Sequence, residues 1–151
     1  MRRSCSRSGF TLLELIVVLA VSSILVSIAV LRLAPTLERA RVQRSATMIA
    51  TDLQWAQMIA ARQRRPVVFL VSEPLKGYMI RDADSSIVFR ESHLGTDTEM
   101  HLDELDATPN RLEIFPNGVV RSAGSYMVRV NTSRRYVRIT RAGQVRITNV
   151  P

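Results

Sequence analysis

The stretch SGFTLLELIVVLAVSSILVSIAVLR, residues 8–32, determines the architecture of the chain. Between Phe10 and Leu31 it holds 22 residues, of which only Glu14 is charged. A helix of this length rises about 33 Å, at about 1.5 Å per residue, which matches the apolar core of a bilayer. Residues 1–9 carry three arginines and no acid, so this flank should stay in the cytoplasm and the rest should lie outside. The sequence therefore predicts a single membrane-spanning helix that contains an unexplained carboxylate.

Three ordinary N-terminal segments fit this stretch poorly. A secretory signal has an apolar core of about 7–15 residues and then a small-x-small cleavage site, whereas here the polar boundary, Ser8-Gly9, precedes a longer run. A lipoprotein signal places its cysteine after the apolar run, whereas Cys5, the only cysteine, comes before it. A plain membrane anchor leaves Glu14 unexplained, because an ionised carboxylate near mid-membrane costs about 3 kcal/mol and such residues are usually functional.

The segment Gly-Phe-Thr-Leu-Leu-Glu-Leu, Gly9 to Leu15, resembles the class III signal of type IV pilins and pseudopilins. The resemblance implies that a prepilin peptidase cuts after Gly9, removing residues 1–9, and that the new N-terminal residue, Phe10, is N-methylated. It also implies that Glu14, at the fifth mature position, meets the α-amine of a neighbouring subunit in a filament. A buried carboxylate becomes tolerable when it is paired, so Glu14 would set the register of the subunits.

A second helical pattern follows the span. From Val42 to Ala60, apolar residues recur at steps of three and four, which predicts a helix with one buried face. We expect one long helix over about 10–63, bent near Pro35, because proline ends or kinks a helix. Residues 10–31 would form the membrane and filament-core part, and residues 32–65 the periplasmic half of the stem. The polar residues expected largely off the buried face are Arg39, Arg41, Gln43, Arg44, Asp52, Gln54 and Gln57.

From Pro66 onwards, short apolar or alternating runs separated by turns predict a β-rich globular head over residues 66–151. The fold class is therefore α+β, with a long N-terminal transmembrane and stem helix packed on an antiparallel β-sheet head. Residues 95–110 contain five acids and neither Lys nor Arg, and we expect them to form a loop. The strands are expected at 66–72, 77–83, 85–91, 111–115, 119–123, 125–131, 134–140 and 144–150, the last three as a meander.

Three later segments resemble the GspH/FimT group of minor pseudopilins: residues 50–72, 112–130 and 139–147. The resemblance implies a structural subunit of the periplasmic pseudopilus of a type II secretion system, which exports folded proteins. The chain would be a single-pass protein of the inner membrane, with its C-terminal head in the periplasm. The implied partners are the prepilin peptidase, other major and minor pseudopilins, the inner-membrane secretion platform and membrane lipid.

The sequence contains no catalytic constellation that we can identify. His93 and His101 are the only histidines, and they lie in or beside the acidic loop without a nearby Cys or an HExxH arrangement. Neither G-x-S-x-G nor a Gly-rich phosphate loop occurs. The acids of the loop, Asp97, Glu99, Asp103, Glu104 and Asp106, fit no calcium-loop spacing. We therefore expect a protein that is not an enzyme and that needs neither cofactor nor metal.

The C-terminal part is strongly basic, with eight arginines and one acid, Glu113, in residues 111–151. Such a surface could follow a DNA backbone, and Tyr136 could stack on a base. The candidate docking or DNA-binding residues are Arg134, Arg135, Arg138, Arg141 and Arg146. Arginines that alternate with apolar residues are also typical of a strand with one buried and one exposed face. We therefore prefer solvated strand faces, or docking onto acidic neighbouring pilins, over DNA binding.

Two alternatives to the secretion role stay open. One is a FimT-like minor pilin of a type IV pilus, which primes assembly or binds DNA. DNA-uptake pilins of this group resemble one another in a Gly-Arg-x-Arg run, and the matching run here, residues 143–146, reads Gly-Gln-Val-Arg and lacks the first arginine. The other is a membrane-anchored sensor or adhesin, which retention of residues 1–9 would favour.

Overall fold

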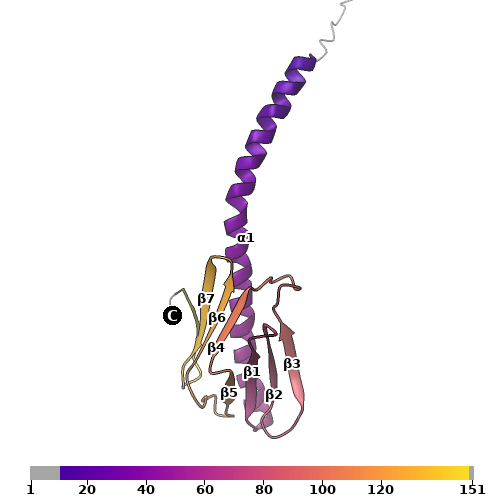
Figure 1. Cartoon of the computed structure of the whole chain (residues 1–151). Coiled ribbons are helices and arrows are strands. Elements are labelled where there is room, and N and C mark those ends of the chain that lie inside the picture. Colours follow the sequence, from indigo (N-terminus) through magenta and orange to yellow (C-terminus); the bar gives the residue numbers. More distant parts are fainter. Residues whose placement is uncertain (1–10, 150–151) are drawn as a thin grey trace, which may run out of the picture. The chain divides into compact units, whose positions relative to one another are not determined.

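The computed structural model describes the backbone of residues 11–149 and the side chains of residues 11–29 and 35–149. Two compact units divide the chain, Met1–Thr36 and Leu37–Pro151. We call the second unit the head. The elements, labelled in Figure 1, are helix α1 (Leu12–Gln63) and strands β1 (Val67–Ser72), β2 (Gly77–Asp82), β3 (Val88–His93), β4 (Glu104–Thr108), β5 (Arg111–Ile114), β6 (Gly124–Val130), β7 (Ser133–Ile139) and β8 (Val145–Thr148).

Helix α1 confirms the expected long helix within the described residues and contains Pro35 in its interior. The boundary between the two units falls between Thr36 and Leu37, directly after Pro35, and each unit is described by itself. The bend expected near Pro35 therefore stays a prediction. The helix ends at Gln63, where Arg64 adopts a left-handed φ of 56°. A left-handed residue after the last turn and a proline soon afterwards, here Pro66, are common helix terminators.

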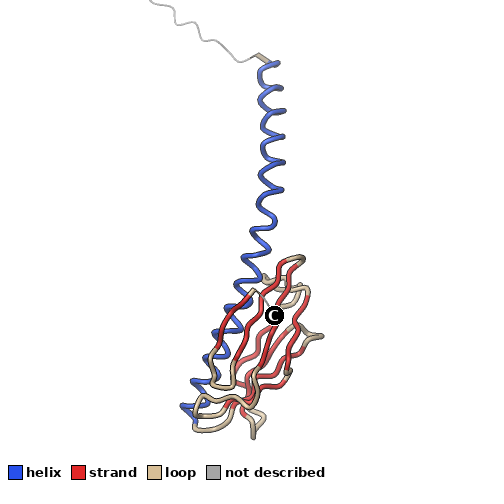
Figure 2. Tube along the Cα trace, turned by 90° about the vertical axis from the view of Figure 1, so that its left-hand side faces the viewer, coloured by secondary structure: helices blue, strands red, loops and turns tan. Residues whose placement is uncertain are grey.

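Within the head, the second part of α1 lies along the strands (Figure 2). Its apolar stripe is buried as the periodicity predicted, and five of its seven members are alanine or valine, which let the strands approach closely. The buried members are Val42, Ala46, Ile49, Ala50, Leu53, Ala56 and Ala60. Met48 and Trp55 pack at the margin of this core.

The strands form two four-stranded antiparallel sheets, in the orders β3-β2-β1-β5 and β4-β6-β7-β8, where the sequence had suggested one. An aromatic cluster joins the two sheets. Phe69 of β1 stacks on Tyr78 of β2, with ring centroids 4.9 Å apart, and meets Tyr126 of β6 edge-on at 5.4 Å. All three rings are buried, so each sheet contributes its inner face to one core.

Two segments differ in kind from the expected elements, and the strand expected at 85–91 lies instead at Val88–His93. Residues 104–108, expected in a loop, form strand β4, because Leu105 and Ala107 alternate with acidic residues and turn inward. Residues 119–123, expected as a strand, make only an isolated bridge between Val120 and Ile114. The amide of Val120 donates instead to the carbonyl of Arg141, at 3.0 Å, so no regular ladder forms there. The C-terminal meander β6-β7-β8 is confirmed.

Candidate functional site

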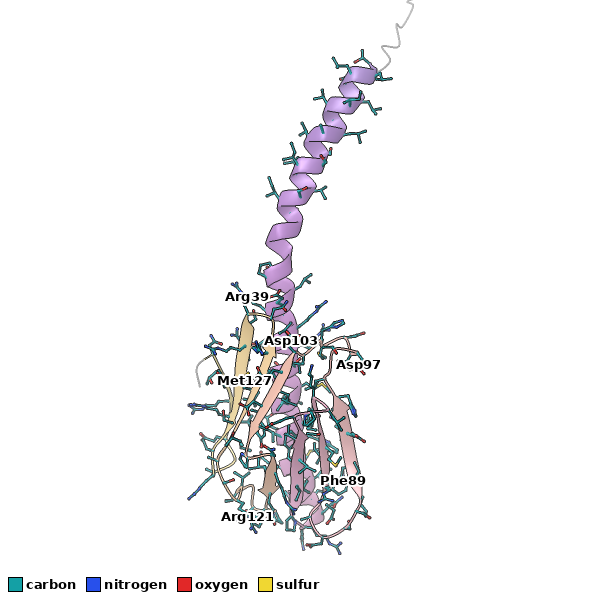
Figure 3. All side chains as sticks on the ribbon, in the orientation of Figure 1. Arg39, Phe89, Asp97, Asp103, Arg121 and Met127 are labelled. Atoms are coloured by element: carbon teal, nitrogen blue, oxygen red, sulfur yellow. The ribbon has the colours of Figure 1, made fainter. Side chains whose placement is uncertain are left out.

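The N-terminal part of α1 has the properties of a membrane or filament-core helix. Leu12–Ala29 has a mean hydropathy of 2.6, and none of it is buried within the chain. Figure 3 shows its side chains pointing outward around the whole circumference. The hydroxyls of Ser23 and Ser27 donate to the carbonyls of Ala20 and Ser23, both at 2.8 Å. These polar groups therefore have partners inside the helix, as an apolar surrounding requires.

Glu14 sits in the first turn of this helix. Its backbone amide donates to the Thr11 hydroxyl at 3.2 Å, and the amide of Leu15 donates to the Thr11 carbonyl at 3.2 Å. Thr11 is therefore the N-cap residue, and Glu14 is at the third helical position, where its backbone amide is capped by the Thr11 hydroxyl. The Glu14 side chain is exposed, and none of the ion pairs in the described part of the chain includes it. A carboxylate at this position interacts favourably with the positive end of the helix dipole, and its side chain remains open to a partner.

The residues predicted to be processed, Gly9 and Phe10, lie outside the described residues, as does Cys5. Their proposed roles therefore stay predictions.

The five candidate arginines fall into two groups at the two ends of β7, although Arg134 shares the exposed face of Arg138 and Arg146. Arg138 of β7 and Arg146 of β8 are directly opposite each other on the exposed face of their sheet, and Arg141 lies in the turn between the two strands. Arg138 and Arg141 line the same shallow hollow. Like charges opposite each other on neighbouring strands repel, so this group is a site that would gain from an anionic partner.

Arg134 and Arg135 lie near the other end of β7, about 13 Å and about 10 Å from Arg138 at about 3.3 Å per residue. Arg134 is exposed on the same face as Arg138. Arg135 alternates to the opposite face, where its Nε donates to the Gln43 side-chain oxygen at 3.0 Å. Both arginines line a hollow together with Arg39 of α1, which sequence reasoning had not connected to them.

The backbone of the β7–β8 turn requires a glycine at position 143, the first residue of the Gly143–Arg146 run. Gly143 has a φ of 81°, and a Cβ added there would lie 2.3 Å from the Gly118 carbonyl oxygen. The Gln57 side-chain amide donates to the Gly143 carbonyl at 2.7 Å, tying this turn to α1. Gly143 is therefore required for the β7–β8 turn whether or not the run contacts a ligand.

Two acids of the segment 95–110 accept hydrogen bonds from the β6–β7 hairpin. Glu104 accepts a hydrogen bond from Arg129 Nε at 2.7 Å, and Asp103 accepts one from the amide of Asn131. Among the described residues, no group of three or more His, Cys, Asp and Glu side chains is arranged to hold a metal ion. His93 and His101 are both exposed.

A buried polar network was not foreseen. Asp52 of α1, expected off the buried face, is only 2% exposed. Its carboxylate accepts a hydrogen bond from the Tyr78 hydroxyl at 2.8 Å and pairs with the Arg90 guanidinium of β3. The same guanidinium lies 4.5 Å from the ring centroid of Trp55. Helix α1 is thus fastened to the edge strand β3 by an ion pair and a cation–π contact.

Burial raises the pKa of the Tyr78 hydroxyl well above its usual range. Ser92 beside it lowers the pKa somewhat, and the hydrogen bond to Asp52 raises it. Tyr78 therefore stays protonated and donates to Asp52 at neutral pH. Arg90 is opposite the buried Ile80 on the neighbouring strand, so it starts from the inner face of the sheet. An arginine at such a position was the signal in the sequence for an internal acidic partner.

Comparisons with known proteins give matches to both parts of the chain. Residues 5–30 match the family described as the prokaryotic N-terminal methylation motif, and residues 45–143 match the family described as type II transport protein GspH. No curated protein matches the chain.

The fold is similar to two crystal structures of the type IV minor pilin FimU from Pseudomonas aeruginosa strain PAO1. One has a TM-score of 0.59 and 23% sequence identity, over 76% of this chain and 91% of that chain. The other has a TM-score of 0.58 and 20% identity, over 70% of this chain and 91% of that chain. At these identities the likeness concerns the fold alone.

Proposed function

The chain belongs to the GspH family of type II transport proteins, and from this premise we propose that it is a minor pseudopilin of a type II secretion system. It would be a structural subunit of the periplasmic pseudopilus that helps to export folded proteins. The family and the fold consist of structural pilin-like proteins, so catalysis is not part of the proposal.

The observation that carries this proposal is the GspH match over residues 45–143, because it covers most of the head. The N-terminal methylation motif supports a pilin-like subunit of either system, since both kinds of filament use it. The head match therefore gives the secretion role its preference over the other pilin-like roles.

The apolar helix would serve the subunit in two surroundings. Its side chains are exposed on all sides, so they can contact lipid in the inner membrane and neighbouring helices in the filament. Because both surroundings are apolar, transfer between them changes little hydrophobic free energy. Specific polar contacts must then decide where a subunit stops, and Glu14 is the one charged group that this part of the helix offers.

We assign the processing steps to the residues of the motif. Prepilin peptidase would cut between Gly9 and Phe10, and Phe10 would be N-methylated. The new amine of one subunit would pair with Glu14 of another, which offsets the cost of a buried carboxylate. The capping position of Glu14 supports this role, because the helix start holds its backbone while its side chain stays open to a partner.

Crosslinking in the native cell envelope, followed by capture of this protein and mass spectrometry of its partners, tests the proposal. Capture of other pseudopilins and of the inner-membrane secretion platform is the expected result. Capture of type IV pilus minor pilins instead would overturn the secretion role and establish the alternative below. Retention of residues 1–9 in the captured protein would overturn both and favour a simple membrane-anchored sensor or adhesin.

The alternative is a FimT-like minor pilin of a type IV pilus that primes assembly or takes up DNA. The likeness of the fold to FimU and the group of Arg138, Arg141 and Arg146 favour it. Arg135 lies on the opposite face from Arg134 and Arg138, which speaks against one continuous track of all five arginines for a nucleic acid. DNA binding by the full chain that is lost in Arg138→Gln/Arg146→Gln would support this alternative.

A further inference from the structure

The end of the head at which α1 joins it carries a concentration of arginines. Arg39, Arg134 and Arg135 line one hollow there, and two more arginines line another with Leu37 and Glu99. Figure 3 labels Arg39 at this end of the head and Arg121 at the opposite end. We call the set the collar arginines: Arg39, Arg41, Arg44, Arg134 and Arg135.

The charge of the collar arginines is largely uncompensated. The ion pairs among the described side chains involve Arg90, Arg121 and Arg129, and no collar arginine takes part. Arg135 donates to the neutral side chain of Gln43. Four of the five collar arginines are exposed and Arg135 is half-buried, so the set presents its charge to solvent.

Two nearby acids are already engaged, whereas Glu99, which lines the hollow of Arg41 and Arg44, takes part in none of the ion pairs of the described residues. Glu38 accepts a hydrogen bond from the Asn131 side chain at 2.8 Å, and Asp103 accepts one from the Asn131 amide. The first bond fastens the β6–β7 turn to the start of the helix in the head, and the second fastens it to the segment before β4. They hold Arg134, three residues after Asn131, close to Arg39. The backbone positions of Arg134 and Arg135 are therefore held beside Arg39.

The chain connects this collar directly to the apolar span. Only ten residues of chain separate Arg39 from Ala29, the last residue of the apolar window, so the collar cannot lie far from the membrane surface. The headgroup region extends about 5–8 Å beyond the apolar core, and electrostatic attraction reaches about a further 8 Å at physiological salt. Leu37, the first residue of the head, is 57% exposed among these arginines. An exposed leucine flanked by cations is a combination typical of segments that lie at a membrane surface.

We propose that the collar arginines bind the anionic headgroups of the membrane in which α1 is anchored. The head of a membrane-resident subunit is then docked on the bilayer surface, and leaving for a filament requires these contacts to break. This inference rests on the proposed membrane anchoring but not on which filament the subunit joins. A nucleic acid or an acidic pilin neighbour would need to be recruited, whereas the anchor supplies lipid headgroups to the collar at high local concentration.

The test uses the full chain reconstituted into bilayers of phosphatidylcholine, with and without phosphatidylglycerol. Cys5, the only cysteine, is replaced by serine, and Thr132→Cys in the exposed β6–β7 turn carries a fluorophore. Lipids with a nitroxide on the headgroup quench the fluorophore when the collar is docked. A second labelled variant, Ser22→Cys within the span, is quenched by acyl-chain nitroxides and reports on anchoring alone.

We expect stronger headgroup quenching at position 132 when phosphatidylglycerol is present, and loss of the difference at high salt. In Arg39→Gln/Arg134→Gln the ratio of docked to free heads should fall roughly five-fold for each arginine removed. The matched control, Arg138→Gln/Arg146→Gln, removes the same charge from elsewhere on the head and should keep the quenching. Unchanged far-UV circular dichroism shows that the variants are folded.

Equal quenching at position 132 in neutral and anionic bilayers would overturn the proposal, as would an equal loss in the control variant. Absence of acyl-chain quenching at position 22 would instead show that the anchoring itself fails. The two failures are therefore distinguishable.

Discussion

Replacing Arg90 by methionine tests the network that holds α1 against β3. Asp52 is 2% exposed, so the variant leaves a buried carboxylate whose remaining partner in the described structure is the Tyr78 hydroxyl. Breaking a buried ion pair by removing one partner costs about 3–5 kcal/mol, whereas an exposed pair contributes about 0–1 kcal/mol. Because the Arg90 side chain is 43% exposed, we expect an intermediate loss, about 2 kcal/mol in the free energy of unfolding.

Urea unfolding of the full chain in detergent, followed by circular dichroism and by the fluorescence of Trp55, measures this loss. Trp55 is the only tryptophan, and it lies directly under the Arg90 guanidinium. Methionine keeps a favourable contact with the ring, so the substitution removes charge more than packing. Arg121→Met is the matched control, because Arg121 pairs with Glu113 while its side chain is 70% exposed. The control should change stability by less than about 0.5 kcal/mol.

A double-mutant cycle with Asp52→Asn isolates the cause. If the cost comes from an uncompensated carboxylate, Arg90→Met should cost at least about 1 kcal/mol less in the Asp52→Asn background than alone. Equal losses in the two backgrounds would refute the reasoning. So would a loss for Arg90→Met no larger than that of the control.

Four further predictions follow from single residues. Gly143→Ala should lower the free energy of unfolding by about 3 kcal/mol and Gly118→Ala by about 1 kcal/mol, because both have a φ near 80° but only Gly143 faces a carbonyl; equal losses in urea unfolding would contradict this. Tyr126→Phe should leave stability unchanged or raise it by up to about 1 kcal/mol, because its buried hydroxyl has no hydrogen-bond partner among the described residues, and a clear loss would point to a partner. Burial raises the pKa of Tyr78 and Tyr126 in the folded state, so these tyrosines ionise first in the unfolded state, and the melting temperature should decline as the pH rises above about 10 but not just below it. Glu14→Gln should leave insertion and the fold of the head intact but reduce incorporation at least about ten-fold, the equivalent of about 1.4 kcal/mol, in blots of filaments crosslinked in the cell envelope; normal incorporation would remove Glu14 from its register role.

The amino-acid sequence by itself determined the features that depend on local pattern. A run of apolar residues as long as Phe10–Leu31 has few uses other than a membrane or filament-core helix, because its backbone polar groups are satisfied within it. The three- and four-residue spacing from Val42 to Ala60 likewise predicted the buried face of α1, since helical geometry sets which side chains share a side. The strand meander at the C-terminus followed from alternation and short turns.

The tertiary structure decided the features that depend on pairing between distant segments. Strand β4 lies in a run so acidic that its two-residue alternation was hidden, and pairing with β6 decides which face of it is buried. Asp52 is buried because Arg90, 38 residues away, and Tyr78 satisfy its carboxylate.

The arginines show the same division. Their number was plain from composition, but their grouping depends on strand register, because neighbours in sequence point to opposite faces of a sheet. Arg135 consequently points away from the face that Arg134 and Arg138 share. Arg134 and Arg135 both line a hollow with Arg39 of α1, which no local pattern could have predicted.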